Sequence, residues 1–360
     1  MKQFAPSQKD IQSIVEEINN QCAEPMCIME VCGTHTMSIF KHGIRSLLPK
    51  TLKLLSGPGC PVCVTPQSNL DQFILATQQE NVIVASFGDL FRVPANHSTL
   101  LLERSQGHDV RVVYSPIDAL ILAQENPDRT VIFLAVGFET TAPTVAATII
   151  MAQEQNIKNF FILSAHRRVV PALESLIQHP ETKIDGFLLP GHVSTIIGEA
   201  AYQHIPTQYG IGGVIAGFEA YDILYAIYRL ITMHKSGKPT IVNAYPRAVH
   251  KLGNLKANSL MSQVFTITDS KWRGIGLIPR SGLILNEHFV NFDAANHFDL
   301  EIKEPADPKG CQCGDILMGL ILPSQCRLFG NRCTPQNPIG PCMVSSEGTC
   351  AAYFRYEFYT

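Results

Sequence analysis

The sequence has no long hydrophobic run, no excess of one charge and no familiar nucleotide-binding motif. No uninterrupted apolar segment approaches the ~20 residues that a helix needs to cross a bilayer. Residues 1–10 are polar and lack the apolar core of a signal peptide. The 28 basic and 31 acidic side chains give a formal net charge of −3, which offers no electrostatic reason to bind nucleic acid. We therefore expect a soluble, cytoplasmic protein whose partners include neither a membrane nor a nucleic acid.

Two glycine-rich signatures of nucleotide binding are also missing. No Gly-x-Gly-x-x-Gly follows a predicted strand, and no Gly-x-x-x-x-Gly-Lys followed by Ser or Thr occurs. A bound nucleotide therefore has no motif to support it. The sequence leaves open whether ATP is hydrolysed together with a partner.

Cysteine is absent from the middle of the chain and concentrated near both ends. All 11 cysteines lie either at or before Cys63 or at or after Cys311. Because their number is odd, they cannot all pair within one chain. In a reducing compartment this distribution favours metal binding or redox chemistry over a framework of structural disulfides. The sequence assigns no role to Cys22 or Cys27.

The stretch 56–66 joins a predicted strand at 52–55 to a predicted helix at 67–79 and carries Cys60 and Cys63. Its glycines and prolines indicate a tight turn, so both thiols are expected at a strand-to-helix junction. A helix N-terminus stabilises a thiolate, which suits a dithiol that switches to a disulfide. Half of a metal site and two buried structural cysteines are the alternatives.

A second strand-to-helix junction carries Cys32. The apolar run 28–32 stops at Gly33, and a helix is expected from there to Leu48. Cys32 is therefore predicted to end a strand, with His35 one helical turn behind it. His35 could orient the Cys32 thiolate or hold its proton, or it could be an ordinary histidine on the helix surface.

Apolar strand-like runs alternate with helix-length segments from residue 81 to residue 234. Strands are predicted at 81–86, 110–114, 130–136, 159–163, 184–189 and 212–216. Helices are predicted at 10–20, 98–106, 117–124, 142–155, 169–178, 196–204 and 220–234, and a further helix at 248–261 precedes short extended segments at 264–268 and 272–279. The alternation is typical of parallel sheets covered on both faces, and the polar turn at 125–129 favours two open sheets over one barrel. The predicted fold class is therefore α/β, with two open, Rossmann-like parallel sheets.

The ends of the predicted strands carry polar turns. Ligands of open α/β sheets bind outside the carboxyl ends of the strands. The sequence therefore predicts one cleft lined by Asp89, Arg92, Glu139, Thr140, Thr141 and His192. The two threonines could instead be helix N-caps. Glu139 and His192, expected in buried turns, are the preferred functional candidates.

The last cysteines lie in sequence that is rich in glycine and proline. Successive members are separated by six, eight and seven residues in the series Cys326, Cys333, Cys342 and Cys350. Loop-borne thiolates at such spacing suit an iron–sulfur cluster, which takes four cysteine ligands. Structural zinc is the main alternative, although zinc sites usually use more closely spaced cysteine pairs. Cys311 and Cys313 are too close for a comfortable chelate, and are either spectators or an alternative pair of ligands.

Taken together, these motifs resemble the HypD family of hydrogenase maturation factors from one end of the chain to the other. The matching stretches are residues 29–36, 57–65, 87–89, 137–143, 190–194 and 326–353. Some members of the family have a histidine where this chain has Met37, so no ligand role is expected at position 37.

The resemblance implies three domains: α/β domains at 51–122 and 123–240, and a cysteine-rich domain made of 1–50 together with 241–360. It also implies a [4Fe-4S] cluster, a redox-active pair and a thiolate that holds iron. By motif these would be Cys326, Cys333, Cys342 and Cys350 for the cluster, Cys60 and Cys63 for the pair, and Cys32 for the iron. His35, Glu139 and His192 would surround that iron, and the last two could hydrogen-bond cyanide nitrogens.

The function implied is a scaffold on which the Fe(CN)₂CO unit of [NiFe]-hydrogenase is assembled as transient cargo. Its expected partners are the small chaperone HypC, then HypE and through it HypF, and indirectly the hydrogenase large subunit. From the residues alone an enzyme is the alternative, namely an iron–sulfur-dependent disulfide reductase. Cys32 discriminates between the two, because a reductase needs no third reactive cysteine on a separate turn.

Overall fold

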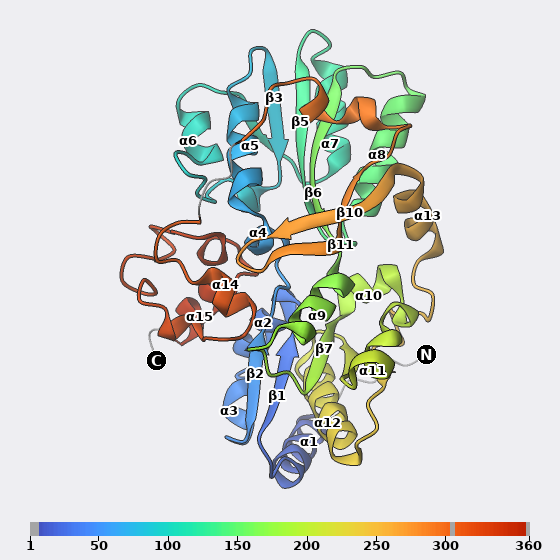
Figure 1. Cartoon of the computed structure of the whole chain (residues 1–360), viewed down its shortest axis with the longest axis vertical. Coiled ribbons are helices and arrows are strands. Elements are labelled where there is room, and N and C mark those ends of the chain that lie inside the picture. Colours follow the sequence, from blue (N-terminus) through green and yellow to red (C-terminus); the bar gives the residue numbers. More distant parts are fainter. Residues whose placement is uncertain (1–6, 303–306, 358–360) are drawn as a thin grey trace.

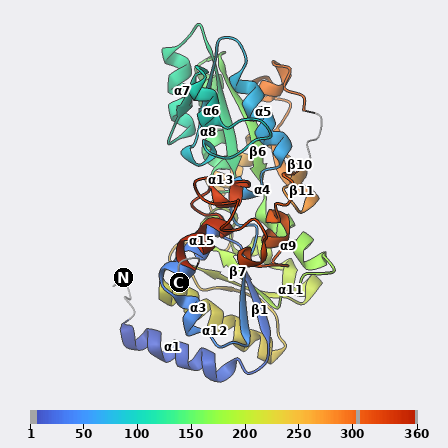
Figure 2. The same cartoon turned by 90° about the vertical axis from the view of Figure 1, so that its left-hand side faces the viewer.

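Two sheets lie end to end along the long axis of the molecule. The computed structural model describes residues 7–302 and 307–357. Figure 1 shows one sheet in the lower half and the other in the upper half, and Figure 2 shows the same division from the side. We call them the lower sheet and the upper sheet. The α/β fold class with two largely parallel sheets is thereby confirmed.

The lower sheet is entirely parallel, in the order β2-β1-β7-β8-β9. Its strands are β1 (Met26–Glu30), β2 (Leu52–Ser56), β7 (Gly186–Pro190), β8 (Gly212–Ala216) and β9 (Ile241–Asn243). The middle residue of each of β1, β2, β7 and β8 is apolar and buried, as expected for strands covered on both faces. One face packs against α1 (Gln8–Gln21), α2 (Gly33–Lys41), α3 (Ile44–Leu47) and α12 (Ala220–Ser236).

The upper sheet has the order β10-β11-β6-β5-β3-β4 and combines parallel strands with an antiparallel hairpin. The parallel strands are β3 (Val82–Ser86), β4 (Val110–Val112), β5 (Thr130–Gly137) and β6 (Phe160–Arg167). The hairpin consists of β10 (Phe265–Trp272) and β11 (Gly276–Leu285). One face packs against α7 (Pro116–Glu125), α8 (Ala142–Glu154) and α13 (Leu255–Val264), and the other against α4 (Pro61–Val64), α5 (Gln67–Thr77) and α6 (Leu100–Ser105).

The chain crosses repeatedly from one sheet to the other. It leaves the lower sheet through α4 and α5, returns through α9 (Val169–Gln178), and leaves again through α13. As a result β2 pairs with β1, while β5 pairs with β3. Strand pairing therefore runs across the predicted boundaries at residues 50 and 122. Alternation along the sequence indicates strands and helices, but it does not reveal which strands share a sheet.

Three predicted helices end or begin elsewhere than expected. The segment 196–204 is divided into α10 (Gly191–Ile197), the 3₁₀ turn η2 (Glu199–Tyr202) and α11 (His204–Tyr209). The break falls at Gly198, whose φ of 81° lies outside the helical region. The helix expected after Gly33 likewise divides at Gly43 into α2 and α3. The helix expected from residue 248 starts only at Leu255, where Asn254 caps its N-terminus.

The C-terminal part has little regular structure, and we call residues 307–357 the cysteine-rich segment. It contains α14 (Cys313–Leu317), the 3₁₀ turns η5 (Pro323–Gln325) and η6 (Pro341–Met343), and α15 (Thr349–Tyr356). Figure 1 shows α14 and α15 beside the junction of the two sheets. No helix in the described part of the chain is both long and apolar enough to cross a membrane.

Candidate metal and redox site

The carboxyl ends of both sets of parallel strands face each other. In Figure 1 the strands β1 and β3 point toward the narrow middle of the molecule from opposite sides. We call this junction the waist, formed by residues 31–35, 57–65, 137–141 and 190–194. All of these turns follow directly after strands, at the position where open α/β sheets bind ligands.

Cys32 lies at the waist as the N-cap residue of α2, directly after β1. The backbone amides of Thr34 and His35, which are free because they open the helix, favour the charged form of the Cys32 sulfur, although the side chain makes no capping hydrogen bond. Burial nevertheless raises the pKa of the Cys32 thiol to about 12, and the nearby Glu347 carboxylate adds to that rise. Cys32 is therefore a neutral thiol at neutral pH, and a bound cation would have to displace its proton.

Cys60 and Cys63 lie on the neighbouring turn and form a disulfide. Cys60 is the N-cap of α4, and its sulfur accepts a hydrogen bond from the Cys63 amide at 3.1 Å. The prediction placed both thiols at the start of the helix 67–79, but they belong to a separate helix of 4 residues that Pro66 divides from α5. Both residues are buried.

The two thiol-bearing turns are in direct contact. The Gly33 amide donates to the Gly59 carbonyl at 3.2 Å. A Cβ atom on Gly59 would lie 2.3 Å from the backbone nitrogen of Cys32, closer than any real side chain allows. Only glycine lets the backbone of the Cys60 turn approach the Cys32 turn this closely. The structure thus brings the three predicted cysteines of the N-terminal half into one place.

His35 is fully buried, so the interpretation as a surface histidine is wrong. Its Nε2 atom lies 2.9 Å from the Gly217 carbonyl oxygen and must carry a proton to donate to it. That leaves Nδ1 as a lone-pair acceptor, and it has no hydrogen-bond partner among the described residues. Burial lowers the pKa of His35 to about 4, so the ring is neutral.

His192 and Phe218 extend this group of rings. Phe218 lies between the two histidines, with ring centroids 4.8 Å from His35 and 4.0 Å from His192. His192 is at the start of α10 but is exposed, so the expectation of a buried turn is wrong for this residue. The waist thus has an exposed imidazole that the Phe218 ring separates from the buried one.

Glu139 is buried, as predicted, and belongs to the turn after β5. Its two carboxylate oxygens accept the Val169 amide at 3.0 and 3.2 Å, at the N-terminus of α9. Burial raises the pKa of Glu139 to about 7.

The remaining residues of the predicted cleft differ in their surroundings, and of these only Thr140 and Thr141 share the turn of Glu139. Asp89 is exposed, and Arg92 donates from Nη2 to the Pro335 carbonyl at 2.6 Å. Arg92 thus attaches the upper sheet to the cysteine-rich segment. Thr141 precedes α8 but makes no capping hydrogen bond, because its hydroxyl donates to the Phe138 carbonyl.

Sequence reasoning missed two carboxylates beside Cys32. Glu30 ends β1, is fully buried, and accepts hydrogen bonds from the Cys32 amide and the Thr36 hydroxyl. Glu347 comes from the loop between Cys342 and Cys350 and accepts from the Thr34 hydroxyl at 2.7 Å. Glu30 stood within the matched motif, and an acidic residue between two apolar strand residues was a usable signal. Glu347 depends on a contact over 313 residues of sequence, which no local pattern reports.

The six cysteines of the cysteine-rich segment line one cavity, which we call the cysteine cavity. Its volume is about 20 Å³, and its other walls are formed by Gln312, Ile316, Leu328, Phe329, Gly340 and Met343. The thiols belong to Cys311, Cys313, Cys326, Cys333, Cys342 and Cys350. No carboxylate or imidazole lines it. In the described part of the chain, no three Cys, His, Asp or Glu side chains are arranged as ligands of a single metal ion.

The thiols of the cysteine cavity interact with one another. Hydrogen bonds from Cys311 and Cys342 hold the pKa of Cys313 well below its usual value. Donation to Cys313 and to Cys350 raises the pKa of Cys342 well above its usual value. The sequence left Cys311 and Cys313 as spectators or alternative ligands, and the structure places both in the same wall as the predicted cluster ligands.

Comparison with known proteins agrees with the motifs placed here. A family model described as HypD: Hydrogenase formation hypA family matches residues 9–357. The chain belongs to this family. It is 46% identical over 336 residues to the hydrogenase maturation factor HypD of Azotobacter vinelandii, covering 91% of this chain and 89% of that protein.

Relatives of the HypD family come from distant organisms. The HypD of Escherichia coli is 44% identical over 334 residues, with 92% of this chain and 90% of that protein covered. A hydrogenase expression/formation protein of Methanocaldococcus jannaschii, named as putative, is 41% identical over 350 residues, with 96% and 97% covered. The predicted family is thereby confirmed, while the roles of individual residues stay predictions.

Proposed function

We propose that this member of the HypD family acts in hydrogenase maturation, as the scaffold on which the Fe(CN)₂CO unit of the [NiFe] site is assembled. The observation that carries the proposal is the contact between two separate thiol-bearing turns at the waist, one with Cys32 and one with the Cys60–Cys63 disulfide. A dithiol switch alone does not require a third cysteine beside it. A site that must both hold a metal and change redox state does.

In this proposal Cys32 holds the iron substrate. Cyanide and CO favour low-spin ferrous iron, and a soft thiolate complements such a centre. Cys32 is a neutral thiol until a cation arrives, because burial disfavours its charged form. Iron binding would then release one proton from Cys32, and the two amides of Thr34 and His35 would stabilise the sulfur charge that remains.

Cys60 and Cys63 are proposed as the redox pair. Opening their disulfide takes two electrons and two protons and yields two thiols within the same short turn. Their Cα atoms are 5.2 Å apart, so the turn accommodates the closed form without rearrangement. The open form would place two further sulfur atoms beside Cys32.

The cysteine cavity is proposed to hold a [4Fe-4S] cluster, ligated by Cys326, Cys333, Cys342 and Cys350. The fit is supported by the wall itself, which offers only sulfur ligands, distributed around a cavity enclosed by apolar side chains. Such a cluster supplies electrons one at a time. Cys311 and Cys313 border the same space and remain available as alternative ligands.

His35, Glu139 and His192 are proposed to surround the iron site rather than to bind the metal. The unpartnered Nδ1 of His35 can accept a proton or a hydrogen bond close to Cys32. His192 is exposed, so a partner protein could contact it directly. We expect the partner to be the small chaperone HypC, with HypE and HypF supplying cyanide and the hydrogenase large subunit receiving the product, in the cytoplasm.

An iron–sulfur-dependent disulfide reductase is the second candidate function. The disulfide at the waist favours this function. The cysteine cavity belongs to the cysteine-rich segment, and η6 of that segment lies against α4, the helix that carries Cys63. A reductase function would give Cys32 no role. The two functions therefore make opposite predictions for a variant that lacks this thiol alone.

The decisive experiment compares Cys32→Ala with wild type, each co-purified with HypC without oxygen. Infrared spectroscopy should show cyanide and CO stretching bands in wild type and none in Cys32→Ala. Cys27→Ala is the matched control, because Cys27 lies on the same strand at the end remote from the waist. Bands that persist in Cys32→Ala would refute the proposed ligand. A wild-type complex without bands but with active reduction of the Cys60–Cys63 disulfide would support the reductase.

A further inference from the structure

Arg273 is buried at the turn between β10 and β11, next to the waist. Its side chain is 1% exposed. Its backbone amide donates to the Val64 carbonyl at 2.8 Å, directly after Cys63, and its Nη1 donates to the Gln67 side chain at 3.0 Å. The guanidinium is thus fixed against the segment that follows the Cys60–Cys63 pair.

The charge of Arg273 is poorly balanced within the described part of the chain. Its Nη2 atom is buried and has no hydrogen-bond partner. The nearest carboxylate oxygen, on Asp307, is 3.8 Å away and belongs to a side chain that is 49% exposed. Gln67 is a neutral acceptor. A buried guanidinium with so little compensation is costly, which indicates that a negative charge nearby balances it in the working protein.

The cysteine cavity is the place where such a charge would arise. Next to Arg273, Gly274 packs on Gly314 so tightly that a Cβ on Gly274 would lie 2.1 Å from the Gly314 Cα. Gly314 follows Cys313, so consecutive Cα spacings place the backbones of Arg273 and Cys313 about 11 Å apart at most. Cys311 and Cys313 both line the cysteine cavity, so Arg273 lies close to its wall.

We propose that Arg273 is the buried counter-charge of an anionic metal–thiolate centre in the cysteine cavity, and that it makes this centre easier to reduce. The inference rests on the proposed [4Fe-4S] cluster and assigns Arg273 the role of a positioning residue that acts through its charge. An added electron makes a cluster with four thiolate ligands more negative, so a fixed cation beside it stabilises the reduced form. The backbone amide of Arg273 contacts Val64 and its guanidinium contacts Gln67, so the residue also lies beside the segment that follows the Cys60–Cys63 pair.

The size of the effect follows from Coulomb's law. At an effective dielectric constant of about 20, a unit charge within roughly 10 Å changes a one-electron equilibrium constant by on the order of tenfold. A tenfold change corresponds to about 59 mV for one electron. An exposed arginine at a similar distance has a much smaller effect, because solvent screens it.

The test is a redox titration of the anaerobically purified full chain with dithionite, followed by electron paramagnetic resonance. Arg273→Gln should shift the midpoint to more negative potentials by about 59 mV, a tenfold change in the equilibrium constant. Arg273→Lys keeps the charge and should stay close to wild type. Arg332→Gln removes an exposed arginine beside Cys333 and should leave the midpoint unchanged.

Iron and acid-labile sulfide are measured in the same samples. A wild-type chain that holds a cluster, with equal midpoints in wild type and Arg273→Gln, overturns the inference about Arg273 and leaves the proposed function standing. Equal shifts in Arg273→Gln and Arg273→Lys overturn it as well, because they indicate lost packing rather than lost charge. A wild-type chain without iron and sulfide overturns both the cluster and the role of Arg273. If Arg273→Gln fails to fold, Arg273→Met replaces it in the titration. A midpoint potential in Arg273→Met equal to that of wild type would then refute the proposed effect of the Arg273 charge.

Discussion

The two sheets end at the waist with different chemistry. The carboxyl edge of the lower sheet carries sulfur, in Cys32 and in the Cys60–Cys63 disulfide, whereas the corresponding edge of the upper sheet carries buried Glu139 and Arg167 and no cysteine. The turns of the lower sheet touch one another through glycine, but a Cβ on Gly88, after β3, would have its nearest neighbour at 3.8 Å. The lower sheet thus presents tightly packed ligand groups, and the upper sheet supplies charged groups around them.

The largest expected effect breaks the packing of the lower sheet. Gly59→Ala forces a methyl group to within 2.3 Å of the Cys32 backbone nitrogen, so the two turns must separate. We expect a loss of about 3 kcal/mol in the free energy of unfolding, or no folded protein. Urea denaturation followed by circular dichroism measures this loss.

Gly88→Ala is the matched change at the upper sheet. Gly88 has room for a methyl group and does not have a positive φ, so its replacement should change the free energy of unfolding by less than about 1 kcal/mol. In Gly59→Ala that still folds, the Cys32 thiol should also react faster with iodoacetamide. Equal stability losses in the two variants would contradict the asymmetry between the edges.

Much of this comparison could be predicted from the sequence, because it depends on local order. Apolar runs bounded by glycine and proline identify the strands, and whatever follows a parallel strand lies at its carboxyl end. That reasoning placed Cys32, Cys60 and Glu139 correctly at strand ends. It also indicated two sheets rather than one barrel.

The predictions that were wrong or missing concern contacts between segments that are distant in the sequence. The burial of His35 could not be predicted, because the Gly217 carbonyl that contacts its ring lies 182 residues away in the sequence. Arg273 and Glu347 stand in sequence without regular periodicity, and their partners lie on other elements. The pairing of β2 with β1 instead of with β3 follows from the repeated crossing of the chain between the sheets, which no local pattern records.

A smaller effect should come from the carboxyl group of the upper sheet. Burial raises the folded-state pKa of Glu139 to about 7, above the usual value of 4.5. Between these two values the folded state holds a proton that the unfolded state has lost, so stability falls as pH rises, by at most about 1.4 kcal/mol per pH unit. Glu139→Gln cannot ionise and should lose this contribution to the slope, becoming more stable than wild type above pH 7.

Urea denaturation at several values between pH 4.5 and pH 8 tests this. Glu154→Gln, at the exposed end of α8, is the control and should keep the wild-type slope. A constant difference between Glu139→Gln and wild type over the whole range would mean that Glu139 does not titrate there.

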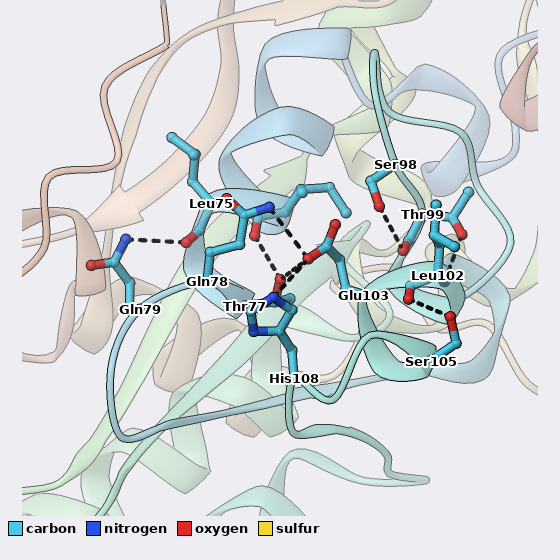
Figure 3. A network of polar contacts seen from close by, with 11 residues as sticks. Leu75, Thr77, Gln78, Gln79, Ser98, Thr99, Leu102, Glu103, Ser105 and His108 are labelled. Carbon is cyan, nitrogen blue, oxygen red and sulfur yellow. Dashed lines mark hydrogen bonds and ion pairs between the residues drawn. The ribbon is translucent and has the colours of Figure 1, made fainter.

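The upper sheet has a second buried carboxylate, Glu103, which lies away from the waist. Figure 3 shows it on α6, where one carboxylate oxygen meets the side chains of Thr77, Gln78 and His108. The distances are 3.3 Å to the Thr77 hydroxyl, 3.3 Å to the Gln78 amide and 3.4 Å to His108 Nε2. Unlike Glu139, which lies in a turn of the waist, this carboxylate is held by side chains from the end of α5 and from the loop between α6 and β4.

The smallest expected effect separates these two carboxylates by function. Glu103→Gln keeps the shape but weakens hydrogen bonds to a charged acceptor, so we expect a loss of about 1 kcal/mol in the free energy of unfolding. Arg104→Gln, one residue along α6 and exposed, should change it by less than about 0.5 kcal/mol. Infrared bands of the complex with HypC should be unchanged in Glu103→Gln, because the network ends far from Cys32. If the cyanide bands changed in Glu103→Gln but not in Glu139→Gln, the upper sheet would influence the iron site from somewhere other than the waist.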